Sequence, residues 1–106
     1  MMKPLDPILM EYRRRLEEIY GPRLVRLVMF GSSARDEATS DSDIDVLIVL
    51  SGPLDDWCET QRTSEVTSEL SMKFDIEISR FFSTPEDYEN KPLSFFENVR
   101  RDGVPV

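Results

Sequence analysis

The sequence predicts a small α/β domain, and three observations support this prediction. Residues 24–30 and 46–50 are short apolar runs rich in Leu, Val and Ile and bounded by turn residues, as expected for buried strands. Residues 74–82 begin with alternating apolar and polar residues, which is typical of a strand with one buried face. Apolar residues at helical spacing precede, separate and follow these segments. The 106 residues can form one hydrophobic core, so we expect a single domain over residues 1–106.

The expected helices have start and stop signals. Asp6-Pro7 is typical of an N-cap followed by a first-turn proline, and Gly21-Pro22 would end that helix. We expect a second helix over residues 54–70 and a last one between Thr84-Pro85-Glu86 and Gly103. The connection between the first two strands is short, which favours an antiparallel pair, so the sheet should be mixed.

Composition excludes several classes of protein. The formal net charge is −8, and such a surface repels phosphates, so no nucleic-acid partner is expected. No stretch reaches the roughly 18 apolar residues of a membrane helix, so no membrane partner is expected. Cys58 is the only cysteine, which indicates a reducing, cytoplasmic setting. The chain has no histidine, which rules out a Cys/His catalytic pair and disfavours zinc.

Two groups of polar residues flank the buried strands. Gly31-Ser32 ends the first strand, where a glycine and a hydroxyl residue allow backbone N–H groups to approach an anion. Asp43 and Asp45 begin the second strand at alternate positions, so their carboxylates should share one face. At about 7 Å they repel by about 2 kcal/mol at a dielectric constant near 20. A magnesium ion carrying a nucleotide triphosphate would relieve this repulsion. The alternative is that both are solvated turn residues.

Arg35 has two interpretations. Residues 32–36 can form one helical turn that starts at the glycine-serine bend, with its N–H groups and positive dipole end facing an anion. On this turn Arg35 could contact a phosphate, or it could pair with Asp41 or Asp43 and fix the connecting loop.

The spacing of these residues resembles a known signature. Phe30-Gly31-Ser32, ten intervening residues and Asp43-Ile44-Asp45-Val46 resemble the motif of the polymerase-β-like nucleotidyltransferase superfamily. The chain is most similar to its minimal nucleotidyltransferase branch, whose members are often encoded beside a HEPN-domain partner. Three further segments are similar to that branch: Ser33-Ala34-Arg35, Ser40-Asp41-Ser42 and the ending from Asn98 to Val104. One residue departs from the branch, because Asp36 stands where glycine is usual.

This resemblance implies a nucleotidyltransferase fold, a small mixed β-sheet with helices packed on it, and a metal-dependent transfer of NMP, such as AMP from ATP, to a hydroxyl. It implies that Asp43 and Asp45 hold two Mg²⁺ ions, and that Gly31, Ser32 and Arg35 bind the nucleotide. A third carboxylate is expected on the next strand, where Asp75 lies between two apolar residues and Glu77 is the fallback.

The resemblance also implies a partner. Its branch silences some HEPN toxins by AMP transfer to a tyrosine, so a protein hydroxyl is the first expected acceptor and an aminoglycoside the second. Between Phe81 and Phe96 the sequence has more aromatic residues than a small core needs, and an exposed patch there would mark a partner surface or a homo-oligomer contact. The alternative function is therefore a catalytically weak binding module that grips a HEPN-type partner through this segment.

Overall fold

The protein folds around one mixed four-stranded sheet. The structure is a computed structural model that describes residues 6–31 and 44–106. The strand order is β3-β2-β1-β4. The first strand pairs antiparallel with its neighbours on both sides, while β2 and β3 pair in parallel, so the prediction of a mixed sheet is confirmed. The strands are β1 (Leu24–Phe30), β2 (Ile44–Leu50), β3 (Ile78–Ser83) and β4 (Val104–Pro105).

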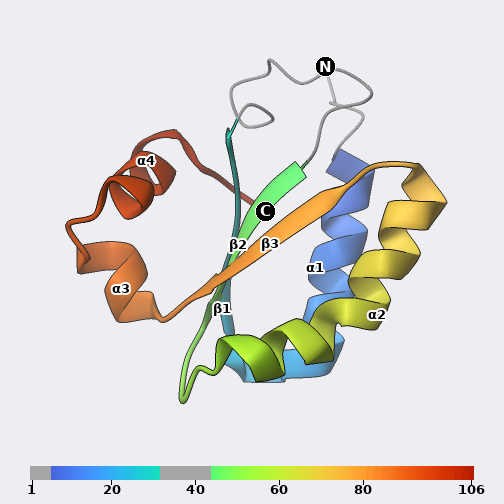
Figure 1. The fold of residues 1–106 in the computed structure, drawn as a ribbon, viewed down its shortest axis with the longest axis horizontal. Helices are drawn as coiled ribbons and strands as arrows, with labels where there is room; N and C mark the ends of the chain where they lie inside the picture. Colours follow the sequence, from blue (N-terminus) through green and yellow to red (C-terminus); the bar gives the residue numbers. More distant parts are fainter. Residues whose placement is uncertain (1–5, 32–43) are drawn as a thin grey trace.

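Helices cover both faces of the sheet. Figure 1 shows α1 (Asp6–Tyr20) and α2 (Asp56–Phe74) on one side, and α3 (Pro85–Asn90) and α4 (Ser94–Asp102) on the other. A 3-10 turn, η1 (Gly21–Arg23), leads from α1 into β1. None of the helices in the described part of the chain is long and apolar enough to cross a membrane.

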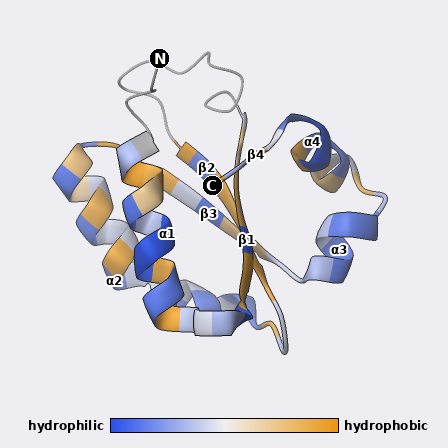
Figure 2. Ribbon diagram, turned by 180° about the vertical axis from the view of Figure 1, so that it is seen from behind, coloured by the Kyte–Doolittle hydropathy of each residue, from blue (hydrophilic) through white to orange (hydrophobic). Residues whose placement is uncertain are grey.

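The sheet carries apolar side chains on both faces, and most of β1 and β2 has the colour of hydrophobic residues in Figure 2. The larger core lies between the sheet and the α1/α2 layer, and even-numbered residues of β2 point into it. Odd-numbered residues of β2 point to the α3/α4 layer, where a smaller core forms from Val28, Leu47, Val49 and Val99. Since both faces of β2 are covered, its sequence is continuously apolar after Asp45.

Two buried hydroxyl groups connect the first two helices. The Tyr12 hydroxyl lies 2.8 Å from Thr67 Oγ1, and the Tyr20 hydroxyl donates to Glu59 Oε1 at 2.8 Å. The Glu59 carboxylate is buried and also lies 3.6 Å from Arg62 Nε. These contacts satisfy polar groups that would otherwise be costly to bury.

The free energy of unfolding should fall at high pH because the Tyr20 hydroxyl is buried. Burial of the phenol, reinforced by the Glu59 carboxylate, raises the pKa of Tyr20 above its usual value. The folded state therefore keeps a proton that the unfolded state loses above about pH 10, and the stabilisation present below that pH declines as the pH rises. Urea unfolding between pH 8 and pH 11 should show the advantage of the parent over Tyr20→Phe shrinking with pH. Parallel stability curves would contradict this assignment.

Two sequence-based boundaries are wrong. The predicted strand over residues 74–82 starts only at Ile78, because α2 continues to Phe74 and ends with Asp75 in the left-handed conformation, at φ 53°. The predicted last helix is two helices, since Lys91 precedes Pro92 and adopts an extended conformation that ends α3. A proline disfavours helical geometry at the residue before it.

Candidate active site

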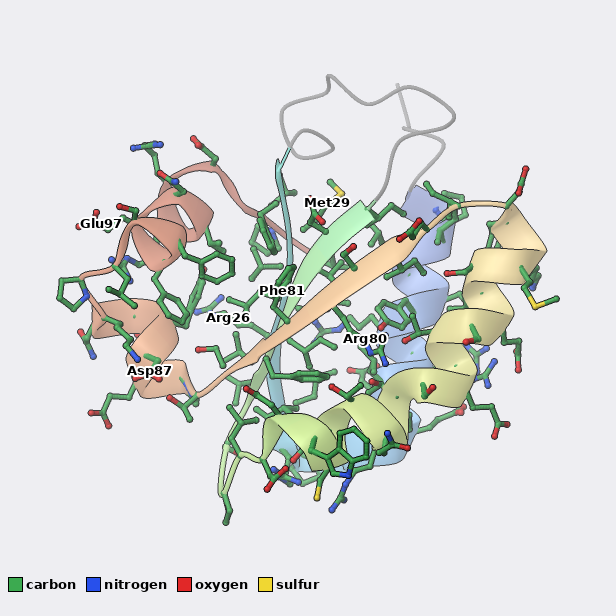
Figure 3. All side chains as sticks on the ribbon, viewed as in Figure 1. Arg26, Met29, Arg80, Phe81, Asp87 and Glu97 are labelled. Carbon is green, nitrogen blue, oxygen red and sulfur yellow. The ribbon has the colours of Figure 1, made fainter. Side chains whose placement is uncertain are left out.

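The best-defined part of the candidate site is the contact between Gly31 and Asp45. Gly31 follows β1 directly, next to the strand end marked by Met29 in Figure 3. Asp45 is the β2 residue paired with Phe30. A methyl group on Gly31 would lie 2.6 Å from Asp45 Oδ2, so the carboxylate rests against the bare Cα. Gly31 also has φ +79°, a conformation that favours glycine. Gly31 and Asp45, which belong to separate parts of the sequence motif, thus make contact across the antiparallel pair of β1 and β2.

Asp45 projects to the α3/α4 side of the sheet. Its neighbours Ile44 and Val46 are fully buried in the larger core, and side chains alternate along a strand. In the parallel pairing with β3, Asp45 lies opposite Ser79, which is half-buried. No local sequence pattern singles out Ser79, because its position beside Asp45 follows from the strand register.

The expected third carboxylate requires a correction. Asp75 was expected on the third strand, but it is the exposed residue that ends α2, and its backbone N–H bonds to the Ser71 carbonyl. The expectation that Asp75 lies on the third strand is therefore wrong. Helix packing extends α2 by one further turn and moves the start of the strand beyond both residues.

Glu77 lies much closer to the start of β2. The Ile44 N–H donates to the Glu77 carbonyl at 2.8 Å, and the register aligns Ile78 with Ile44. Glu77 directly precedes β3, and its neighbours Ile76 and Ile78 both pack into the larger core, so the exposed Glu77 side chain points away from that core, toward the side of the sheet that carries Asp45. Glu77 lies two positions before Ser79, the β3 residue paired with Asp45, and at extended spacing this corresponds to roughly 8 Å between the Cα atoms of Glu77 and Asp45.

Three expected site residues lie outside the described residues: Ser32, Arg35 and Asp43. Within residues 6–31 and 44–106, no three Asp, Glu or Cys side chains gather closely enough to hold a metal ion. The carboxylate oxygens of Asp45 and Glu77 are nevertheless hard donors of the kind that Mg²⁺ prefers.

A pocket adjoins this contact on the α4 side. It has a volume of about 220 Å³, and Gly31 forms part of its lining. The rest comes from Phe30 on β1 and from one side of α4, mainly Phe95, Asn98 and Arg101. In the sequence, Phe95 lies in the aromatic-rich segment between Phe81 and Phe96, and Asn98 begins the ending that is similar to the minimal nucleotidyltransferase branch. Only the packing of α4 beside the end of β1 brings these residues next to Gly31.

Comparisons with known proteins identify the family of this chain. The family model described as "Nucleotidyltransferase domain" matches residues 9–102. The "Putative protein adenylyltransferase MJ0141" of Methanocaldococcus jannaschii is 33% identical over 100 residues, which are 93% of this chain and 95% of that protein. The chain belongs to the nucleotidyltransferase domain family. The resemblance to nucleotidyltransferases found in the sequence is thereby confirmed.

Two crystal structures share the fold. A "putative nucleotidyltransferase" from Sulfolobus solfataricus has a TM-score of 0.64 at 19% identity, covering 93% of this chain and 76% of that one. A structure described as "the toxin-antitoxin with AMP-PNP" has a TM-score of 0.62 at 18% identity, covering 90% of this chain and 69% of that one. The predicted nucleotidyltransferase fold is confirmed.

Proposed function

We propose that this protein is a metal-dependent adenylyltransferase that transfers AMP from ATP to a hydroxyl group of a partner protein. The observation that carries the proposal is the Asp45 carboxylate resting against Gly31. A glycine turn suited to phosphate and a carboxylate suited to a metal ion are thereby adjacent, as a metal-bound triphosphate requires.

The proposed roles follow from donor chemistry. Asp43 and Asp45 would hold two Mg²⁺ ions, with Glu77 as the third carboxylate. Gly31 and Ser32 would bind the outer phosphates through backbone and hydroxyl groups, and Arg35 would contact a phosphate or fix its own loop. Bound Mg²⁺ would neutralise the charge that develops on the triphosphate during the reaction.

The reaction is an in-line displacement. Glu77 would accept the proton of the acceptor hydroxyl, whose oxygen then forms a bond to the α-phosphorus. The bond from that phosphorus to the bridging oxygen breaks, and pyrophosphate leaves with the electron pair. Most of the acceleration would come from positioning the two reactants and from electrostatic stabilisation.

The role of Glu77 can be separated from that of Asp75 by a matched pair of variants. Glu77→Gln should reduce the rate of AMP transfer by about 100-fold, the contribution of a positioned general base. Asp75→Asn should leave the rate nearly unchanged, because asparagine tolerates the left-handed conformation observed there and the side chain is exposed. Initial rates with labelled ATP measure both. A large loss with Asp75→Asn and none with Glu77→Gln would reverse the assignment.

The acceptor is proposed from the relatives. MJ0141 carries the description of a protein adenylyltransferase, and one structure of similar fold is a toxin-antitoxin with AMP-PNP. Together with the resemblance to the branch whose members are often encoded beside a HEPN-domain partner, these descriptions support a HEPN-domain protein in the cytoplasm as the partner and its hydroxyl side chain as the acceptor. An aminoglycoside is the second acceptor to be tested.

The test of the proposed function is a transfer assay. The protein is incubated with α-labelled ATP, Mg²⁺ and a HEPN-domain protein, and the label on the HEPN protein is measured after denaturing electrophoresis. Label should appear with Mg²⁺ and disappear when EDTA removes the metal. A parallel reaction with kanamycin tests the small-molecule acceptor. Absence of label from every acceptor would contradict the proposal.

The second candidate function is that of a binding module. It is favoured by an exposed aromatic side chain of the sheet, which could contact a partner protein. Phe81 on β3 is 43% exposed and contacts Phe30 and Phe95, with ring centroids 5.6 Å away in each case. If the protein neutralises a HEPN partner by sequestration alone, neutralisation will not depend on ATP or Mg²⁺, and Phe81→Ser will weaken the complex.

A further inference from the structure

We propose that the pocket between the end of β1 and helix α4 binds the nucleoside part of the nucleotide substrate. This inference rests on the proposed function, because it supplies the binding site for the part of ATP that the glycine turn and the carboxylates do not contact. It assigns substrate binding to Phe95 and Asn98, two residues far in the sequence from the Gly31 and Asp45 motifs.

The position of the pocket supports this assignment. Gly31 lines it and also contacts the Asp45 carboxylate, so the pocket and the proposed metal-phosphate site share one residue. A triphosphate bound at Gly31 would leave its nucleoside within a few bonds of that residue. The pocket volume of about 220 Å³ is below the ~300–1,000 Å³ typical of sites for whole drug-sized ligands. The pocket therefore suits one part of a nucleotide, with the phosphates outside it.

One side of the pocket is aromatic. The Phe95 ring meets Phe30 edge-on, with centroids 5.4 Å apart and an interplanar angle of 86°, and meets Phe96 at 5.1 Å in the same manner. Neighbours on two sides restrict the ring, so Phe95 offers a fixed apolar surface in the pocket. Stacking on such a ring is a sequence-tolerant way to bind a nucleobase.

The α4 side of the pocket is polar. Arg101 donates from its terminal nitrogen to Asn98 Oδ1 at 2.9 Å and forms an ion pair with Asp102 at 3.3 Å. A guanidinium group can only donate, so this bond fixes the Asn98 amide with its oxygen toward Arg101. Both amide hydrogens of Asn98 then remain for an acceptor. Ring nitrogens of a base and ribose oxygens are acceptors of that kind.

Helix α4 is held firmly against the sheet. Val99 is buried between α4 and the sheet, and Gly103 fits so closely that a methyl group there would collide with the Val99 carbonyl and with Val28. On the other side, Arg100 donates to the Tyr88 carbonyl of α3 at 2.7 Å. The α4 wall of the pocket is therefore in place before any ligand arrives, which limits the entropic cost of binding.

Two ligands separate the nucleoside contribution from the phosphate contribution. Calorimetry would measure the Kd of Mg²⁺-ATP and of Mg²⁺-tripolyphosphate, which has the phosphates alone, for the parent, Asn98→Ala and Phe95→Leu. Asn98→Ala and Phe95→Leu should each raise the Kd of ATP by about tenfold, a change of about 1.4 kcal/mol, and leave the Kd of tripolyphosphate unchanged. Asn98→Asp keeps the shape and replaces the donor by an acceptor, so it should also weaken ATP binding.

Matched controls show whether the effect is specific to the pocket. Asn90→Ala removes an exposed amide from α3, and Trp57→Leu removes an exposed ring from α2 that does not line the pocket. Both should bind ATP as the parent does, and thermal unfolding should show that all variants fold.

Three outcomes would contradict either the nucleoside pocket or the proposed function, and the measurements distinguish them. Unchanged ATP binding in Asn98→Ala, Asn98→Asp and Phe95→Leu would overturn the nucleoside pocket and leave the proposed function standing. Equal loss of ATP and tripolyphosphate binding would also overturn it, because the effect would then not concern the nucleoside. A parent protein that binds neither ligand would contradict the proposed function itself, and the pocket assignment would fall with it.

Discussion

Replacing Gly31 with alanine is expected to reduce AMP transfer by at least about 100-fold, the loss typical of a misplaced reactive group. Two physical effects combine in this variant. The added methyl group would lie 2.6 Å from Asp45 Oδ2, so the carboxylate must move away from the glycine turn. The backbone at φ +79° would also be strained by any side chain. Single-turnover rates with labelled ATP, with thermal unfolding as the measure of folding, would test this expectation.

Gly21 provides the matched control for that experiment. It also has a positive φ, +56°, but a methyl group there would meet nothing within 4 Å. Gly21→Ala should therefore cost about 1–2 kcal/mol of stability and leave the transfer rate intact. If both variants lose activity in proportion to their stability, the contact between Gly31 and Asp45 has no special role in the reaction.

Asp45→Asn is expected to reduce AMP transfer by at least about 1,000-fold, because a bound metal ion contributes several kcal/mol to stabilising the transition state. Asparagine has the shape of aspartate but lacks its charge, so the metal should be held weakly while the strand pairing of β2 is kept. Titration with Mn²⁺, followed by its effect on the relaxation of water protons, would show the loss of metal binding independently of the transfer rate.

Asp87 is a suitable control for the loss of one negative charge. It lies on α3, where Figure 3 labels it, and its partner is Lys91 at 3.8 Å. Asp87→Asn should keep both metal binding and transfer. Equal rates for the parent and Asp45→Asn would contradict the metal-binding role of Asp45.

The sheet could be predicted largely because its central strands are defined by local composition. Residues 27–29 and the apolar run after Asp45 are buried on both faces, so their patterns are continuous and end close to turn residues. The third strand was predicted poorly. Phe74, Ile76 and Ile78 all pack into the larger core, so their alternation resembles a strand although Phe74 still belongs to a helix. Where α2 ends depends on its packing and on Asp75 adopting a left-handed conformation, which no local pattern indicated.

The candidate site was predictable to the extent that it lies in one contiguous motif. Gly31 and Asp45 were predicted from spacing, and the structure brings them into contact. Glu77 was only the fallback, because its alignment with the start of β2 depends on the parallel register, which is a long-range property. Phe95 and Asn98 were not predicted as site residues for the same reason. Their position beside Gly31 arises from the docking of α4 on the sheet.

The close fit of Gly103 against Val28 and the Val99 carbonyl has a kinetic consequence. An enzyme that closes a flap over its substrate waits for that motion, which commonly takes microseconds to milliseconds. Here the wall formed by α4 is already fixed to the central sheet, so no movement of α4 should delay the capture of the nucleotide.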